Sequence, residues 1–390
     1  MKALLILILF HGSLLVTACA QTDSADRLKI TLSSPLNYQV FQRQTKAVGT
    51  IIIAGQLEVQ GHTALTNLDR LEACLIGNTV TNAWAPLPFD NRVRRFRGEL
   101  AAPAGGWYRL EIRLTGHGLV AWTATVEHVG VGELFLVAGQ SNSANHGEEK
   151  QSAKSPLVVA YSILDGHWQP ARDPEPGASG KGGSFLPAFG DAMTAHFQVP
   201  VGLVALGVGS TSVREWLPAG DAMAAPPTTG MNTITTGSNQ WVCTGALFDK
   251  IVAAEKTFGP HGFRALLWHQ GESDSRQPPD REITPAQYRM YLQRVIESSR
   301  TAAGWRVPWF VAQASYHTPE DQSTPELCAA QKSLVTDGLA LAGPATDQLG
   351  PEFRQNNGRG IHFNARGLQR HGQLWAEAVT PWLEQQSADK

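Results

Sequence analysis

The chain has 390 residues, 42% of them hydrophobic and 17% charged, which is enough material for two domains with separate cores. The formal net charge is −2 and no long basic run occurs, which argues against nucleic acid as a partner. Beyond the N-terminal segment the cysteines are Cys74, Cys243 and Cys328. Their odd number argues against a disulfide scaffold, and no Cys/His spacing predicts a metal site.

The N-terminus predicts an export signal over residues 1–18. Lys2 precedes the apolar run 3–10, which is too short for a membrane-spanning helix of about 20 apolar residues. The sequence Val-Thr-Ala-Cys at 16–19 resembles a bacterial lipobox, which implies a lipid on Cys19. Because Ala20 follows the cysteine, the resemblance implies anchoring at the outer membrane as the only membrane contact. An ordinary cleaved signal with a chance cysteine is the alternative.

After a polar tether at 19–28, short runs rich in β-formers predict a small Ig-like β-sandwich over 29–128. Two such runs are 48–54 and 71–76. Between residues 107 and 114 apolar and polar residues alternate strictly, as expected for a half-buried strand.

From residue 129 to 386 the pattern changes to alternating strands and helices. Continuous apolar runs predict strands that are buried on both faces, at 134–138, 201–206, 265–268 and 309–312. Helices are predicted at 247–258, 285–303, 327–338 and 365–384. This alternation indicates an α/β domain in which helices cover both faces of a parallel sheet. Active sites in such sheets lie beyond the carboxyl ends of the strands.

Polar motifs occur at the predicted strand ends and before the last helix. They are Gly-Gln-Ser-Asn at 139–142, the Gly-Val-Gly-Ser turn at 207–210, His-Gln-Gly-Glu at 269–272 and Gly-Ile-His-Phe-Asn at 360–364. Each alone reads as a structural turn or helix cap. Together they supply a hydroxyl, a base, a carboxylate and oxyanion donors, which are the parts of nucleophilic acyl transfer.

These motifs, in this order, resemble the sialate O-acetylesterase-like branch of the SGNH hydrolases, which also includes acetylxylan esterases. The resemblance covers about two-thirds of the chain and implies a flavodoxin-like three-layer α/β/α fold that needs no metal or other cofactor. It implies that Ser141 is the nucleophile and His362 the base. The oxyanion donors that it implies are the N–H groups of Ser141 and Gly209 and the side chain of Gln270.

The expected triad acid is missing from its usual place. The resemblance implies an Asp three residues before the catalytic histidine, as in many members, but this chain has Arg359 there, a cation that cannot accept a hydrogen bond. We therefore predict that Arg359 points away from the site and that Glu272 is the acid. Asp274 and Asp347 are weaker candidates, and a Ser–His dyad is a further alternative.

The predicted substrate is an acetylated carbohydrate, contacted by Gln140, Asn142 and Trp216. Two other functions stay open. One is a non-catalytic glycan-binding protein, which Arg359 favours. The other is an SGNH lipase or thioesterase, which the polar loops at 170–184 and 218–240 disfavour.

Overall fold

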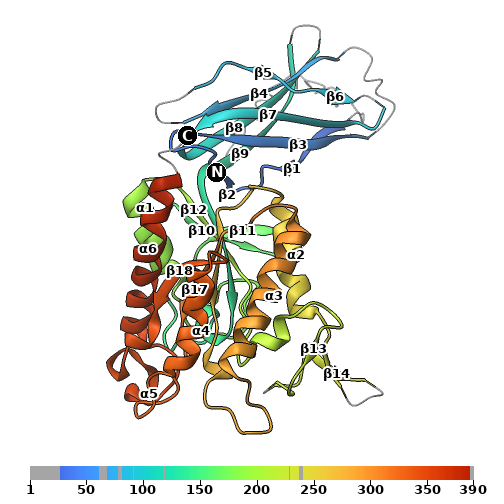
Figure 1. Ribbon diagram of the computed structural model, residues 1–390. Coiled ribbons are helices and arrows are strands. Elements are labelled where there is room, and N and C mark those ends of the chain that lie inside the picture. The colour runs from blue at the N-terminus through green and yellow to red at the C-terminus, as the bar shows by residue number, and fades with distance from the viewer. Residues whose placement is uncertain are drawn as a thin grey trace, which may run out of the picture.

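The computed structural model describes residues 27–60, 68–77, 81–90, 92–116, 119–227, 229–236 and 240–386. The predicted signal and the proposed anchor Cys19 lie outside these ranges. A β-sandwich precedes an α/β domain, and Figure 1 shows the sandwich stacked on one end of the parallel sheet. None of the helices in the described ranges is long and apolar enough to cross a membrane.

The sandwich consists of two largely antiparallel sheets with apolar side chains between them. One sheet has the order β1 (Arg27–Ser34), β3 (Val48–Gln60), β7 (Arg95–Pro103) and β6 (Phe89–Asp90). The other has the order β5 (Ala85–Pro86), β4 (Leu68–Ile76), β8 (Gly105–Gly116) and β9 (Leu119–Gly139). Leu110 and Ile112 of β8 are fully buried between the sheets, which confirms the half-buried strand predicted from alternation.

The long strand β9 belongs to both domains. Its first part pairs with β8 in the sandwich, and its last part, from Glu133 onward, lies in the middle of the parallel sheet. The predicted boundary between residues 128 and 129 therefore falls inside one strand. Sequence patterns missed this continuity because the change from alternating to continuous apolar residues marks a change of burial, not a break in the chain. Strand β2 (Gln39–Gln42) pairs with β9 at this point.

A buried ion cluster lies at the junction of the two domains. The carboxylate of Glu133 is fully buried and accepts hydrogen bonds from Arg43 Nε over 2.5 Å and Arg264 Nε over 2.6 Å. Gln42 Nε2 also donates to this carboxylate, over 2.9 Å. Because Arg43 follows the sandwich strand β2 and Arg264 precedes a strand of the parallel sheet, the cluster joins the two domains.

The parallel sheet has the predicted flavodoxin-like topology. Its order is β12 (Val201–Ala205), β9, β16 (Ala265–His269), β17 (Trp309–Gln313) and β18 (Leu341–Ala345). Numbered along the chain, this order is 2-1-3-4-5. An additional hairpin of β10 (Val158–Ser162) and β11 (His167–Pro170) extends the edge beside β12.

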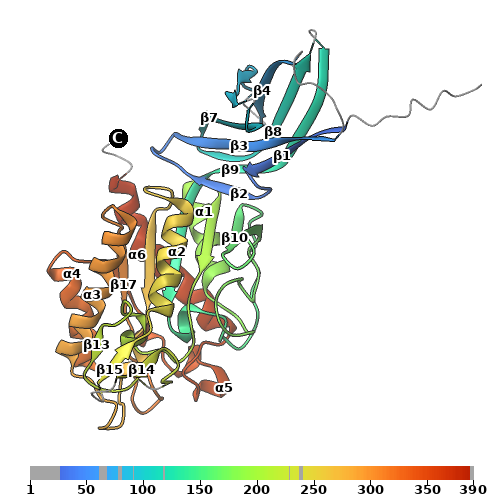
Figure 2. The same cartoon turned by 90° about the vertical axis from the view of Figure 1, so that its right-hand side faces the viewer.

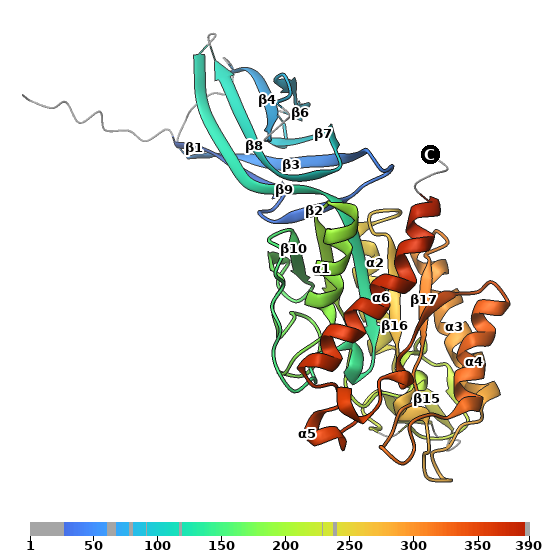
Figure 3. The same ribbon diagram turned by 90° about the vertical axis from the view of Figure 1, so that its left-hand side faces the viewer.

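Helices cover both faces of this sheet. Figure 2 shows α2 (Ala246–Phe258), α3 (Pro285–Ala303) and α4 (Pro325–Thr336) on one face. Figure 3 shows α1 (Leu186–Phe197) and α6 (Ala365–Gln386) on the other. Helix α3 begins where predicted because Thr284 and Gln287 form a capping box and Pro285 occupies its first turn. The region predicted as loop at 218–240 contains short paired strands, β13 (Ala222–Met223) and β14 (Thr233–Thr235), which pair with β15 (Trp241–Cys243).

Candidate active site

Ser141 lies directly beyond the carboxyl end of β9, at the end of the sheet remote from the sandwich. It begins a short 3-10 helix, η2 (Ser141–Ser143), and is 4% exposed. Gly139 makes the turn possible, because its φ is +127° and a side chain there would meet the carbonyl oxygen of His269 at 2.0 Å. The strand end therefore lies directly against β16 and presents Ser141 at the edge where polar turns gather.

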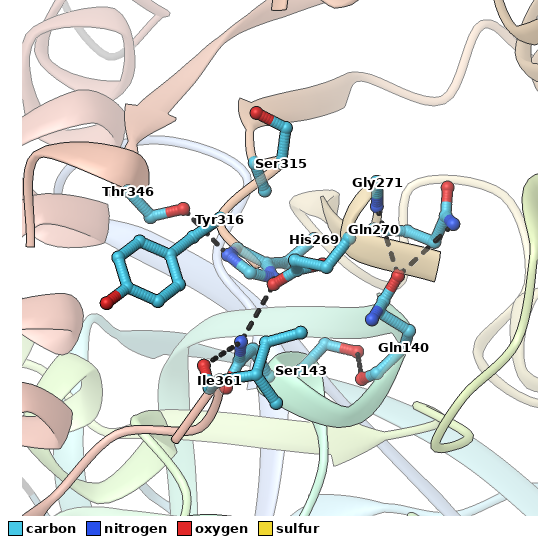
Figure 4. A network of polar contacts seen from close by, with 12 residues as sticks. Gln140, Ser143, His269, Gln270, Gly271, Ser315, Tyr316, Thr346 and Ile361 are labelled. Carbon is cyan, nitrogen blue, oxygen red and sulfur yellow. Dashed lines mark hydrogen bonds and ion pairs between the residues drawn. The ribbon is translucent and has the colours of Figure 1, made fainter. Parts of the chain in front are cut away.

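Gln140, on one side of Ser141, holds the His-Gln-Gly-Glu loop. Its Oε1 accepts hydrogen bonds from the backbone N–H of Gly271 over 3.2 Å and of Ser273 over 2.9 Å, as Figure 4 shows for Gly271. The side chain is 2% exposed. The side-chain oxygen of Gln140 thus binds the loop that follows β16. Its predicted contact with substrate stays a prediction, and only the amide nitrogen is left to make it.

Asn142, on the other side of Ser141, joins three motifs. Its Nδ2 donates to Glu272 Oε1 over 2.7 Å and to the carbonyl of Ile361 over 3.3 Å. Glu272 belongs to the loop after β16, and Ile361 directly precedes His362. Both N–H groups of the amide are used within the protein, so the contact of Asn142 with substrate stays a prediction for its Oδ1 alone.

Trp216 was predicted to contact substrate, and the structure corrects this. Its side chain is fully buried, its Nε1 donates to Thr211 Oγ1 over 3.0 Å, and its ring lies edge-on to Trp268 at 5.3 Å between centroids. It belongs to the core under α2 and α3. Sequence alone places a tryptophan near a loop but does not say which way its ring points.

The three predicted oxyanion donors differ in their surroundings. Within the described residues the N–H of Ser141 has no acceptor, as expected at the start of a helix. The N–H of Gly209 donates to Ser179 Oγ over 2.7 Å. Gln270 is fully buried, and its Nε2 lies 2.8 Å from Asp274 Oδ2 and 3.1 Å from the carbonyl of Thr211. The Ser141 N–H is therefore the donor that is free to bind an oxyanion. The Gly209 N–H and the Gln270 side chain already donate to acceptors within the protein.

His362 is paired with an amide. Its Nδ1 lies 3.0 Å from Gln355 Nε2, and no carboxylate oxygen in the described part of the chain comes within 4.0 Å of either ring nitrogen. Burial, with His146 and Arg354 nearby, lowers the pKa of His362 to about 4. The imidazole is therefore neutral at physiological pH, as a general base requires. No hydrogen bond joins it to Ser141 in this structure, and such contacts often tighten only when substrate binds.

The predicted acids have other partners. Glu272 bonds Asn142 and has one carboxylate oxygen 3.7 Å from His269 Nδ1, while burial raises the pKa of its carboxyl. Asp274 accepts from Ser212 Oγ and the Val213 N–H. The structure therefore places Glu272 behind the site and does not pair it with His362.

Asp347 is engaged elsewhere, because it accepts from the backbone and hydroxyl of Ser315 after β17. Arg359 is exposed, as its charge led us to expect.

Sequence reasoning missed Arg354, a buried cation behind the site. Its guanidinium lies between the rings of Tyr316 and Phe363, at 3.8 and 4.1 Å from their centroids, and donates to the Ile361 carbonyl over 2.8 Å. Arg354 and Asn142 thus share one acceptor next to His362. An arginine eight residues before the histidine has no sequence pattern that separates it from the exposed Arg359.

The comparisons with known proteins concern the family and the fold. The family model for a carbohydrate esterase, sialic acid-specific acetylesterase, matches residues 131–381. A solved carbohydrate acetylesterase from Xanthomonas citri is similar in fold, with a TM-score of 0.50 and 17% identity over 90% of this chain and 74% of that one. A protein from Arabidopsis thaliana gives a TM-score of 0.43 and 19% identity, over 65% of this chain and 98% of that one. No curated protein matches the chain.

Proposed function

Since the chain belongs to the carbohydrate esterase family of sialic acid-specific acetylesterases, we propose that it removes O-acetyl groups from carbohydrates through an acyl-enzyme on Ser141. The observation that carries the proposal is the pair of hydrogen bonds that the side-chain amide of Asn142 donates. By bonding both Glu272 and Ile361, this amide draws the segments that follow β16 and precede α6 to the residue next to Ser141. Nucleophile, base and oxyanion donors then share one edge of the sheet.

The reaction proceeds in two acyl transfers. Ser141 Oγ attacks the acetyl carbonyl carbon while His362 Nε2 takes the hydroxyl proton, and the Ser141 N–H stabilises the oxyanion. The bond from the acetyl carbon to the sugar oxygen breaks, and that oxygen takes the proton from His362. Water then attacks acetyl-Ser141, gives a proton to His362 and releases acetate as Ser141 regains its proton. The balance is ester plus water to alcohol plus acetic acid, which ionises to acetate and a proton at neutral pH.

One hollow beside the His362 segment is mostly polar, which supports a hydrophilic substrate over the acyl chain of a lipase or thioesterase. A hollow of about 460 Å³ next to the His362 segment is lined by charged and amide side chains that include Glu148, Glu149, Asn357 and Asn364. Apolar walls, which a long acyl chain needs, are largely lacking among these lining residues.

The test is acetate release from a panel of acetylated carbohydrates, including acetylated sialic acid and xylan, by the wild type, Ser141→Ala and the exposed control Ser152→Ala. We expect Ser141→Ala to lose activity by up to about 10⁶-fold and Ser152→Ala to keep it. If the wild type binds these glycans but releases no acetate, the chain is a glycan-binding protein on the same fold, an outcome that the missing carboxylate at His362 favours.

We also propose that the protein is exported and held at the bacterial outer membrane by a lipid on Cys19. The support is the apolar run that ends in Val-Thr-Ala-Cys at 16–19. Mass spectrometry of the N-terminal peptide of the native protein should find a lipid on Cys19, absent in Cys19→Ser. An unmodified Cys19 would overturn this proposal without touching the enzymatic one.

A further inference from the structure

Gln355 and His362 are held together by both backbone and side chains. The N–H of Gln355 donates to the carbonyl of His362 over 2.9 Å, and the neighbouring residues Arg354 and Phe363 form an antiparallel bridge. The side-chain amide of Gln355 then reaches His362 Nδ1 over 3.0 Å. The two residues therefore face each other across a tight hairpin whose geometry the backbone fixes.

The turn between them is built to let this side chain pass. A side chain at Gly360 would meet Gln355 Cγ at 2.2 Å, so Gln355 crosses directly over the glycine on its way to the imidazole. Asn356 and Asn357 have φ angles of 55° and 57°, which turns the chain sharply after Gln355. Arg359, the residue three positions before His362, lies in this turn and is exposed.

We propose that Gln355 is the positioning residue of the site and takes the place that the triad acid holds in related enzymes. Its Oε1 accepts the proton of His362 Nδ1, which fixes the tautomer in which Nε2 is free to take the proton of Ser141. This inference rests on the proposed function. The structure places Gln355 Nε2, not Oε1, at 3.0 Å from Nδ1; a half-turn of the amide exchanges the two atoms, and no hydrogen bond in the described residues ties Oε1 elsewhere.

A neutral amide orients the imidazole but does not balance its charge. The titratable groups that act on His362 are His146, on the segment after η2, and Arg354, and both disfavour the imidazolium. Glu148, whose Oε1 accepts from Asn356 N–H, is exposed at the rim. A carboxylate in place of Gln355 would add the missing counter-charge, so it should raise the pKa of His362 and keep its orientation.

The first test compares Gln355→Leu, Gln355→Glu and the exposed control Gln369→Leu on α6. Gln355→Leu should lower kcat by about 10²-fold or more with little change in KM, because it removes orientation and leaves substrate contacts in place. Gln355→Glu should restore kcat at pH 8 and shift the acid limb of the kcat/KM profile upward by at least about one pH unit. The control should match the wild type.

The second test does not depend on turnover. In protein labelled with ¹⁵N-histidine, the His362 signals, identified by comparison with His362→Asn, should report a proton on Nδ1 in the wild type and a mixture of tautomers in Gln355→Leu. A proton on Nε2 in the wild type, or an unchanged kcat in Gln355→Leu while Ser141→Ala is inactive, overturns the role of Gln355 alone. An active Ser141→Ala would instead overturn the proposed function.

Discussion

Asn142 donates a hydrogen bond of 2.7 Å to Glu272, a residue 130 positions later in the chain. The same amide bonds the Ile361 carbonyl, so one side chain ties together the loops on either side of Ser141. We predict that Asn142→Ala lowers kcat by about 10²-fold or more, because a displacement of about 1 Å in the reacting groups has that effect. Thermal unfolding should show that the variant is folded. The loss of a buried hydrogen bond to a charged group lowers the free energy of unfolding by only about 1.5–3 kcal/mol. Wild-type kcat in a folded Asn142→Ala would contradict the central place given to this amide.

Glu272→Gln should have a modest effect. The amide oxygen of glutamine still accepts from Asn142, and no contact to His362 is lost because none exists in the structure. We therefore expect a loss in kcat of less than about tenfold, whereas removing an orienting acid from a triad costs about 10⁴. Steady-state kinetics of Glu272→Gln and Gln355→Leu, measured in the same assay, compares the loss in kcat of the two variants. A loss of 10² or more would return Glu272 to the role of acid that the sequence predicted.

The pH profile should reach further into acid than that of an ordinary histidine. The base acts when neutral, so activity is present above its pKa and falls as pH drops through it. Burial lowers the pKa of His362 to about 4, so kcat/KM should stay level from pH 8 to about 5 and reach half its value near 4. Circular dichroism at each pH separates titration from unfolding. A midpoint near 6.5, the ordinary value for histidine, would contradict the buried, uncompensated environment.

Glu133→Ala should destabilise the whole chain. The substitution leaves Arg43, 3% exposed, and the partly buried Arg264 without their carboxylate. Breaking a buried ion cluster in this way costs about 3–5 kcal/mol. The control is Glu377→Ala, whose carboxylate pairs with Arg370 at the surface of α6 and contributes little. Urea unfolding measures both variants, and equal midpoints for the two would refute the role of Glu133 at the junction.

The predictable features were those that depend on local patterns. Apolar runs located β9, β12, β16 and β17, since strands buried on both faces need continuous apolar residues. The carboxyl-edge rule then placed Ser141 and His362 at the same end of the sheet, and the family match confirmed the resemblance. The fold class and the kind of esterase were therefore accessible before any coordinates.

The unpredicted features depend on contacts between residues far apart, or on the path of a turn. Gln355 reaches His362 only because Gly360 leaves room and two asparagines adopt positive φ, and no periodicity encodes that path. Trp216 lies in the core, where its ring packs against Trp268. The two residues are 52 positions apart in the sequence, and no local pattern reveals the contact. The direction of a side chain and the acceptor of a buried amide are set by packing, which sequence patterns do not resolve.

The measurement that tests the account most directly is trapping of the acyl-enzyme. Wild-type protein mixed with an activated acetyl ester is quenched in acid during turnover and digested, and the peptides are examined by mass spectrometry. We predict one added acetyl group on Ser141 that is transient in the wild type and absent in Ser141→Ala. In the His362→Ala variant, acylated with a highly reactive ester, the acetyl group on Ser141 should last longer. Acetate release at the wild-type rate by Ser141→Ala, or an acetyl group carried on another residue during turnover, would contradict the account.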